Sequence, residues 1–272
     1  MTGVRPDQQA LFDRLDRTAR PVVAVIAPGK TGTSTIAAAL KGAGLDPVLQ
    51  THLLRDEHMA EREATYRRGA PERNPRYLWE SQWLCANLPS ADRTWSVVTL
   101  VRDPTARLVS RFFQEKARTG RMQGRPKVAD VVAELTAFFE RDLRGTSPGY
   151  DWLDAQLRDV LGVDVYTHPF DAAVGHLSIS TDHVDVLLLR SEDLPQAAEP
   201  LQSFFGVELP VILAAKNVGQ NKAYAGLYGA VLEAFRPPAE FVEAAYSSRM
   251  MCHFYTPSEI EARHARWTRP IS

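Results

Sequence analysis

Two apolar runs along the chain mark strands of a buried sheet. Residues Val22–Ala27 (VVAVIA) are all apolar and end at Pro28-Gly29, where the chain turns. Residues Thr94–Val101 (TWSVVTLV) form a second run that leads into a charged turn. A short apolar run without polar alternation is typical of a parallel strand that is covered on both faces. Both segments are therefore predicted to be central strands.

Apolar residues recur at helical spacing after each of these runs. A helix is predicted over Thr33–Ala43, with Gly44 as its end, and another from Pro104 to about Thr119. Proline suits the first helical position, and glycine commonly ends a helix. Further predicted helices are Arg55–Arg68, Tyr77–Leu88, Lys127–Arg141, Tyr150–Leu161, Gln196–Phe205, Ala223–Phe235, Ala239–Tyr246 and Pro257–Trp267. The other strand candidates are Pro47–Gln50, Gly162–Tyr166 and Val184–Leu189.

Strands and helices alternate through the first half of the chain, and helices dominate the end. Such alternation favours a parallel sheet with helices on both faces. The predicted fold class is α/β, a P-loop-like three-layer sandwich with a central parallel sheet and a helical C-terminal part. No domain boundary stands out, so residues 1–272 are interpreted as one domain. The segment Gly120–Pro126 is the best candidate for a mobile surface loop.

Composition narrows the class of protein. The 272 residues have 44% hydrophobic content and a formal net charge of -1, so no overall basic excess points to nucleic acid. The two cysteines, Cys85 and Cys252, are far apart and give neither a disulfide framework nor zinc-ligand spacing. The charged N-terminus lacks the apolar core of a signal peptide, and no apolar run is long enough to span a membrane. A cytoplasmic protein is expected.

The turn after the first strand has the composition of a phosphate-binding loop. A loop between a buried strand and a helix presents backbone N–H groups, and the helix dipole favours an anion there. Gly29 and Gly32 allow close approach, and Lys30 adds a positive charge. The hydroxyl donors in this stretch are Thr31, Thr33, Ser34 and Thr35.

The order of residues in this loop differs from that of an ATP-binding loop. The Walker A pattern G-x-x-x-x-G-K-[ST] would place its first glycine at Ala24, inside the strand. Asp103 follows a later strand but is flanked by Arg102 and Pro104, so it makes a poor magnesium ligand motif. A nucleotide kinase is therefore disfavoured, although it stays open.

The stretch PGKTGTST, residues 28–35, resembles the PKSGTT-type loop of sulfotransferases that use 3′-phosphoadenosine 5′-phosphosulfate (PAPS). The resemblance implies that Lys30, Thr31, Gly32, Thr33 and Ser34 hold the 5′-phosphosulfate. It also implies a catalytic role for Lys30 at the bridging oxygen.

A second stretch, VVTLVRDPTARLVSRFF, resembles the 3′-phosphate site of the same family. In that site an arginine at a strand end and a serine eight residues later contact the phosphate, and Arg102 and Ser110 have this spacing. Arginine offers a bidentate fork to phosphate and serine a single donor. Arg107 and Arg111 lie on the same predicted helix and are auxiliary candidates.

Weaker resemblances extend further along the chain. Val186–Pro210 is similar to the family's strand, YEDL-like turn and helix, with Ser191 in place of the tyrosine. Ala214–Tyr228 takes the place of the loop that covers the nucleotide, but its Arg-Lys-Gly signature is missing. Lys222 is the substitute assigned to the 3′-phosphate side, with Lys216 and Asn217 as rivals. The adenine-stacking residue stays unassigned among Trp79, Trp83 and Phe112.

A general base is expected just after the second strand. His52 occupies this position, and a histidine titrates near neutral pH. Glu57 and His58 are the nearest rivals, and a purely structural histidine is the other explanation for a single residue of this kind.

Taken with the resemblance, these motifs predict a PAPS-dependent sulfotransferase. Such an enzyme moves a sulfuryl group to a hydroxyl of a metabolite or glycan precursor and releases PAP. The chemistry requires no metal, and the sequence offers no cluster that would bind one. The segments RDPTARLVSRFF and CHFYTPSEIEARH look most like bacterial carbohydrate-type or capsular-polysaccharide-associated members. A non-catalytic nucleotide-binding protein and a homodimer also stay open.

Overall fold

A computed structural model of the chain describes residues 6–17, 21–69, 75–88, 93–120, 126–143, 151–210, 213 and 225–270. The chain divides into two compact units. Unit 1 comprises Met1–Val101, Leu153–Pro169 and Gly175–Ala214, and unit 2 comprises Arg102–Trp152, Phe170–Val174 and Ala215–Ser272. The expectation of a single domain stays a prediction, and each unit is described by itself.

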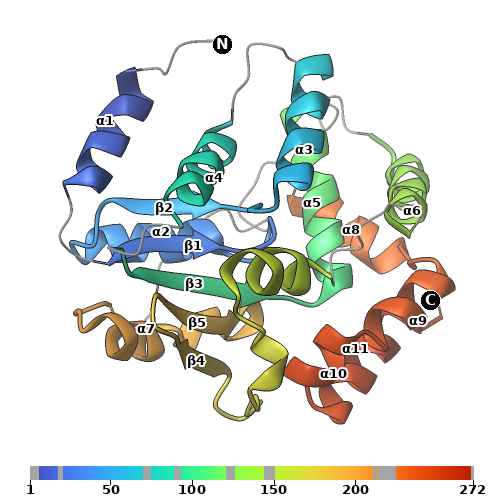
Figure 1. The fold of residues 1–272 in the computed structure, drawn as a ribbon. Coiled ribbons are helices and arrows are strands. Elements are labelled where there is room, and N and C mark those ends of the chain that lie inside the picture. Colours follow the sequence, from blue (N-terminus) through green and yellow to red (C-terminus); the bar gives the residue numbers. More distant parts are fainter. Residues whose placement is uncertain are drawn as a thin grey trace. The chain divides into compact units, whose positions relative to one another are not determined.

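A five-stranded sheet forms the centre of unit 1 (Figure 1). Its strands are β1 (Val22–Ile26), β2 (Val48–Thr51), β3 (Trp95–Val101), β4 (His176–Ser180) and β5 (Val184–Arg190), in the order β2-β1-β3-β5-β4. The three pairs formed by β2, β1, β3 and β5 are parallel. The predicted α/β class and the mostly parallel central sheet are confirmed.

The edge strand β4 is antiparallel to β5 and was not expected from the sequence. Within His176–Ser180 only Ile179 is buried, so the segment lacks the apolar run that marks the other strands. The predicted strand at Gly162–Tyr166 is wrong. A 3₁₀ turn, Val165–Thr167, forms there instead, because the Asp164 carboxylate accepts a hydrogen bond from the backbone N–H of Tyr166.

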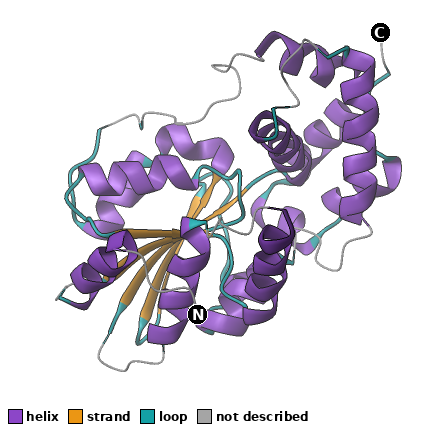
Figure 2. Ribbon diagram, turned by 90° about the horizontal axis from the view of Figure 1, so that it is seen from above, coloured by secondary structure: helices purple, strands orange, loops and turns teal. Residues whose placement is uncertain are grey.

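Helices cover both faces of this sheet (Figure 2). On one face, α2 (Thr33–Gly42) and α7 (Ala198–Phe205) join a core with β1, β3 and β5 that includes Val25, Ile36 and Leu187. On the other face, Trp83 of α4 (Arg76–Asn87) contacts Trp95 of β3, and α1 (Pro6–Asp16) packs on α4 through Phe12. The remaining elements of unit 1 are α3 (Asp56–Gly69), the π-helix Asp154–Leu161 and the 3₁₀ turn Ser191–Gln196.

The described part of unit 2 is mostly helical, which confirms the predicted helical C-terminal part. Its helices are α5 (Pro104–Arg118), α6 (Val128–Leu143), α8 (Ala225–Ala234), α9 (Ala239–Tyr246), α10 (Arg249–Phe254) and α11 (Pro257–Thr268). Aromatic contacts hold several of them together: the Phe139 ring of α6 lies 5.1 Å from Phe235 and 4.7 Å from Phe241 of α9. The sequence did not predict α10, whose six residues are too few for a periodic pattern.

Candidate functional site

The turn after β1 has an unusual backbone. Lys30 adopts a φ of 75°, in the left-handed region that few residues other than glycine occupy, and Gly32 adopts a φ of 100°. Gly32 is the N-cap of α2, and no side chain caps the helix there. The first N–H groups of a helix have no carbonyl one turn back to bind. The strained turn therefore ends at the uncapped N-terminus of α2.

The loop is held from two sides within unit 1. The Thr31 hydroxyl donates to the carbonyl of Pro28 at 2.8 Å, inside the turn itself. The Ser191 hydroxyl lies 2.7 Å from the carbonyl oxygen of Thr31 and 2.9 Å from that of Val101, and it shares its single proton between them. Ser191 thus ties the loop to the end of β3, a role that sequence comparison with a tyrosine-bearing motif did not suggest.

Leu194 packs closely against the same loop. A Cβ atom placed on Gly32 would lie 2.3 Å from Cδ1 of Leu194, far inside van der Waals contact. The backbone angle of Gly32 therefore favours glycine, and any larger residue would also have to displace the end of the Leu194 side chain.

Two of the hydroxyl residues predicted to bind the phosphosulfate lie at the start of α2. Thr33 and Ser34 are its first two residues, and both accept a hydrogen bond from the side-chain amide of Gln50, at 3.0 and 3.1 Å. Gln50 lies on β2 and was not among the predicted site residues. The pairing of β1 with β2, which sets Val25 opposite Gln50, places this amide beside the loop.

His52 lies at the end of β2, beside the start of the loop. Its Nδ1 atom is 2.8 Å from the carbonyl oxygen of Ala27, the residue that follows β1. A carbonyl only accepts hydrogen bonds, so Nδ1 carries the proton and Nε2 is the basic atom of the ring. The ring of Tyr77 lies 5.1 Å from that of His52.

Burial lowers the pKa of His52 below its ordinary value, and the bond to Ala27 opposes this shift only in part. The positive charge of Arg62 acts in the same direction as burial. His52 is therefore neutral near pH 7, which is the form that a general base requires.

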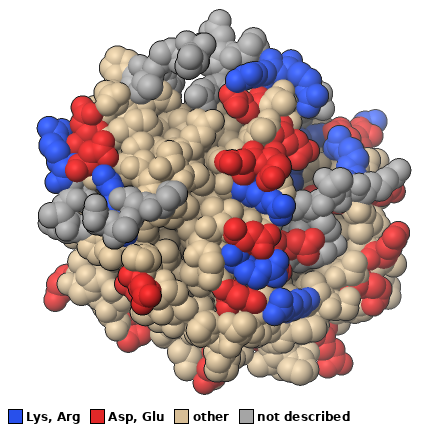
Figure 3. Space-filling model, viewed as in Figure 1, with Lys and Arg blue, Asp and Glu red and all other residues tan. Residues whose placement is uncertain are grey.

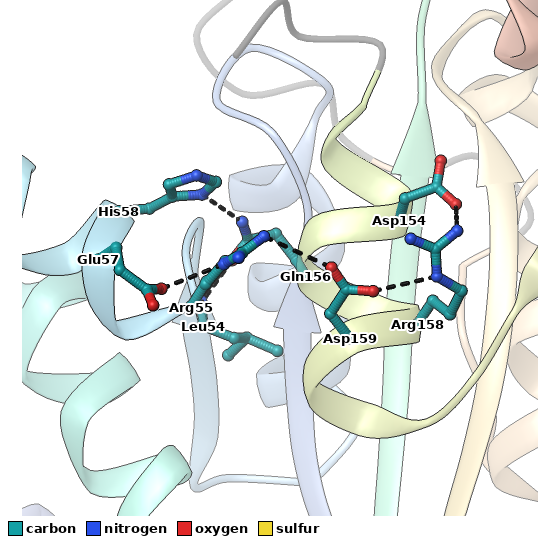
Figure 4. Close-up of polar contacts among 8 residues, drawn as sticks. All are labelled: Leu54, Arg55, Glu57, His58, Asp154, Gln156, Arg158 and Asp159. Carbon is teal, nitrogen blue, oxygen red and sulfur yellow. Dashed lines mark hydrogen bonds and ion pairs between the residues drawn. The ribbon is translucent and has the colours of Figure 1, made fainter. Parts of the chain in front are cut away.

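The chain that follows His52 is fixed by a buried glutamine of the π-helix (Figure 4). The Gln156 carbonyl oxygen accepts the backbone N–H groups of Leu54 and Arg55, and its amide nitrogen lies 2.8 Å from Nδ1 of His58. Gln156 is fully buried. Because its partners lie about one hundred residues earlier, no local sequence pattern identifies it.

The two rival bases have other surroundings. Nδ1 of His58 is engaged with Gln156, and the Glu57 carboxylate forms an ion pair with Arg55 while its side chain is 74% exposed. Arg55 also contacts Asp159, which in turn pairs with Arg158 (Figure 4). The choice of His52 as the base stays a prediction.

The predicted 3′-phosphate residues belong to unit 2. Arg102 directly follows β3 in the chain, and Ser110 lies two turns into α5. Between them, the Asp103 carboxylate caps α5 by accepting the N–H of Ala106, and it also accepts the hydroxyl of Tyr246. Asp103 thus connects the start of α5 with Tyr246 of α9.

The auxiliary arginines of α5 differ in environment. Arg107 is buried, and desolvation lowers its pKa to about 10 although Asp142 opposes the shift. Arg111 pairs with Glu115 at 2.9 Å and with Asp142 at 3.6 Å. Both are thus built into the packing of α5 against α6.

Some predicted features lie outside the described residues. These are Lys222, its rivals Lys216 and Asn217, and most of the Gly120–Pro126 loop. The described part of the chain holds no group of three or more His, Cys, Asp or Glu side chains placed to bind a metal ion. Among the described helices, none combines the length and apolar character that crossing a bilayer demands.

Charges on the visible surface are mixed. Figure 3 shows acidic and basic side chains interspersed on the face that it draws, as the near-zero net charge leads one to expect. An anion site on such a protein depends on local groups, such as those of the loop after β1.

Comparison with known proteins gives one family. Residues 129–256 match the NKWYS family model, described as "Putative capsular polysaccharide synthesis protein". Comparisons with curated proteins and with solved structures give no match. The matched stretch begins after Lys30, His52, Arg102 and Ser110, so it includes none of these predicted site residues and does not reach the loop after β1. The latter part of this chain is thus similar to a family linked with capsular polysaccharide synthesis.

Proposed function

We propose that the protein is a PAPS-dependent sulfotransferase that acts on a hydroxyl of a polysaccharide-related acceptor. The observation that carries the proposal is the loop after β1, in which the strained Lys30 and the glycine N-cap lead into the open N-terminus of α2. Such a turn offers backbone donors and a fixed positive charge to a doubly charged phosphosulfate.

The topology of the sheet supports a ligand at this place. From β1 the chain continues to β2 on one side, whereas β3 lies on the other side of β1 and is followed in the sheet by β5. In open α/β sheets, ligands bind at the carboxyl ends of strands where the strand order diverges in this way. The loop follows the carboxyl end of β1 and is tied by Ser191 to that of β3.

In the proposed reaction, Nε2 of His52 removes the proton from the acceptor hydroxyl. The resulting oxygen attacks the sulfur of PAPS in line, the bond from sulfur to the bridging oxygen breaks, and PAP leaves with the bonding electrons. Lys30 stabilises the negative charge that develops on the bridging oxygen. The hydrogen bond to Ala27 keeps the His52 ring oriented for this transfer.

The other assignments rest on the sequence resemblance alone. They give the 3′-phosphate to Arg102, Ser110 and Lys222, and the 5′-phosphosulfate to the loop residues from Lys30 to Ser34. The family match over residues 129–256 supports a glycan-related acceptor.

Calorimetric titration with PAP and transfer from labelled PAPS test the proposal. Wild-type protein should bind PAP without magnesium and label at least one member of a panel of oligosaccharides and sugar nucleotides. Lys30→Met should lower the transfer rate roughly 10²- to 10³-fold, and Arg102→Ala should weaken PAP binding. Lys41→Met, at the opposite end of α2, is the matched control.

The outcome separates this proposal from the kinase alternative. Tight binding of ADP with magnesium, together with no binding of PAP, would reject a sulfotransferase in favour of a kinase. PAP binding without transfer to any acceptor, even at high enzyme concentration, would point instead to a nucleotide-binding protein.

A further inference from the structure

The side chain of Gln50 forms hydrogen bonds with the first two residues of α2, directly after the loop that follows β1. Its side-chain nitrogen donates to the hydroxyl oxygens of Thr33 and Ser34. An amide nitrogen only donates, whereas a hydroxyl both accepts and donates a single proton. Because each hydroxyl accepts from Gln50, its own proton must go to an acceptor elsewhere. The amide therefore sets both hydroxyls as donors.

The amide is held in place by its own strand. The backbone N–H of Gln50 donates to Oε2 of Glu80 at 2.9 Å, and the fully buried Glu80 side chain pairs with Arg76. Gln50 and Val48 point to the same face of the sheet, the face that α2 covers, because side chains two apart on a strand share a face. The strand residue that carries this amide is thus anchored to α4 through Glu80.

We propose that Gln50 is a positioning residue of the loop and directs the Thr33 and Ser34 hydroxyls toward an anion at the N-terminus of α2. The identity of that anion, the phosphosulfate of PAPS, rests on the proposed function. Its oxygens can only accept hydrogen bonds, so hydroxyls turned into donors match them. A glutamate at this position would accept both hydroxyl protons and add a negative charge beside the anion.

Two substitutions separate this role from a merely structural tie between β2 and α2. In Gln50→Glu the hydroxyls can donate to the carboxylate, so the contacts persist while their polarity is reversed. In Gln50→Met the contacts are lost, but the hydroxyl protons remain available to a ligand. A structural role makes methionine the more harmful change, whereas the positioning role makes glutamate more harmful to binding.

The experiment measures PAP and ADP affinity by calorimetry, and thermal unfolding by circular dichroism, for the wild type and both variants. Gln50→Glu should weaken PAP binding roughly ten- to a hundredfold, the effect expected when hydrogen bonds to a charged group are lost. Gln50→Met should weaken it by no more than about threefold, because only preorganisation is lost. Gln9→Glu, which makes the same charge change at an exposed position of α1, should keep wild-type affinity.

Each outcome decides the inference. Unchanged PAP affinity in Gln50→Glu, or a greater loss in Gln50→Met, overturns it, as does failure of Gln50→Glu to fold when Gln50→Met folds. If the wild type binds ADP and not PAP, the proposed function fails and the same comparison with ADP decides the role of Gln50. If the wild type binds neither nucleotide, both proposals fall.

Discussion

At Gly32 the backbone angle and a neighbouring side chain impose the same requirement. Any L-residue would be strained at a φ of 100°, and its Cβ would collide with Leu194. The glycine content of the loop was visible in the sequence, whereas the second constraint depends on a turn more than 150 residues later. A sequence thus shows where a glycine allows a left-handed turn, but it does not show which distant side chain packs against that glycine.

Gly32→Ala should lower the free energy of unfolding by about 1–3 kcal/mol, because it combines left-handed strain with the steric conflict. Urea unfolding measures the change. Gly42→Ala is the matched control at the other end of α2, where a Cβ meets no atom within 4 Å. It should be neutral or stabilising by up to about 1 kcal/mol. Equal effects of the two substitutions would contradict this account.

His52 should make stability depend on pH. Because its pKa is lowered in the folded state, the unfolded chain binds a proton between that value and about 6.5 while the folded chain does not. The free energy of unfolding therefore has its highest value above pH 6.5. It decreases as the pH falls from 6.5 to the lowered pKa of His52. Urea unfolding at pH 7.5 and at pH 5 should show a smaller difference in His52→Gln than in the wild type.

The exposed His183, substituted by glutamine, is the control for this measurement and should keep the wild-type difference. In the proposed reaction the same titration acts on catalysis. The transfer rate should stay constant down through pH 6.5 and fall only near the lowered pKa of the folded protein, where His52 becomes protonated, since only the neutral ring accepts a proton. A rate that stays constant down to the lowered pKa and beyond would exclude His52 as the base.

Among the elements, the π-helix Asp154–Leu161 organises the turn after His52. Its pattern is apolar at helical spacing, so the sequence predicted a helix over Tyr150–Leu161. It did not predict that the helix is wound as a π-helix or that Gln156 faces inward to accept two backbone N–H groups. Such features occur often at functional sites, and here the partners are fixed by tertiary packing.

Gln156→Leu should destabilise the protein by about 2–4 kcal/mol, because the N–H groups of Leu54 and Arg55 lose their acceptor. Equilibrium unfolding in urea is the measurement. Gln202→Leu on α7 removes a single hydrogen bond, to the carbonyl of Leu209, and should cost no more than about 1.5 kcal/mol. If Gln156→Leu lowered the free energy of unfolding no more than this control does, the hydrogen bonds of Figure 4 would contribute little to stability.

The strands with mostly buried residues were predicted from the sequence, whereas β4, with a single buried residue, was missed. All residues of β1 and β3 are buried, and both runs were recognised. In β4 only Ile179 is buried, and in Gly162–Tyr166 the buried Val163 and Val165 imitate a strand although a 3₁₀ turn forms. The hydrophobic pattern therefore predicts which residues are buried. Whether such residues form a strand or a turn depends on the hydrogen bonds that their backbone makes.

On the scale of the whole molecule, the two cysteines offer a simple test of the fold. Cys252 is exposed, whereas Cys85 is partly buried, bonds to the carbonyl of Leu54, and has its pKa raised by burial to about 11. The thiolate is the reactive form, so only Cys252 should react quickly. A colorimetric thiol reagent should titrate one group in the native protein and two in 6 M guanidinium. Two fast groups in the native protein would contradict the buried placement of Cys85.

The edge of the sheet at β2 has a consequence for self-association. Exposed edge strands present unpaired N–H groups on which the strand of another chain can build, which is a route to aggregation. At Gln50 the Glu80 carboxylate already occupies the place that a foreign carbonyl would take. A strand added at this point would have to expel a buried charge and separate it from Arg76. The pair that steadies the amide beside the loop thus also guards this end of the sheet against growth into a fibre.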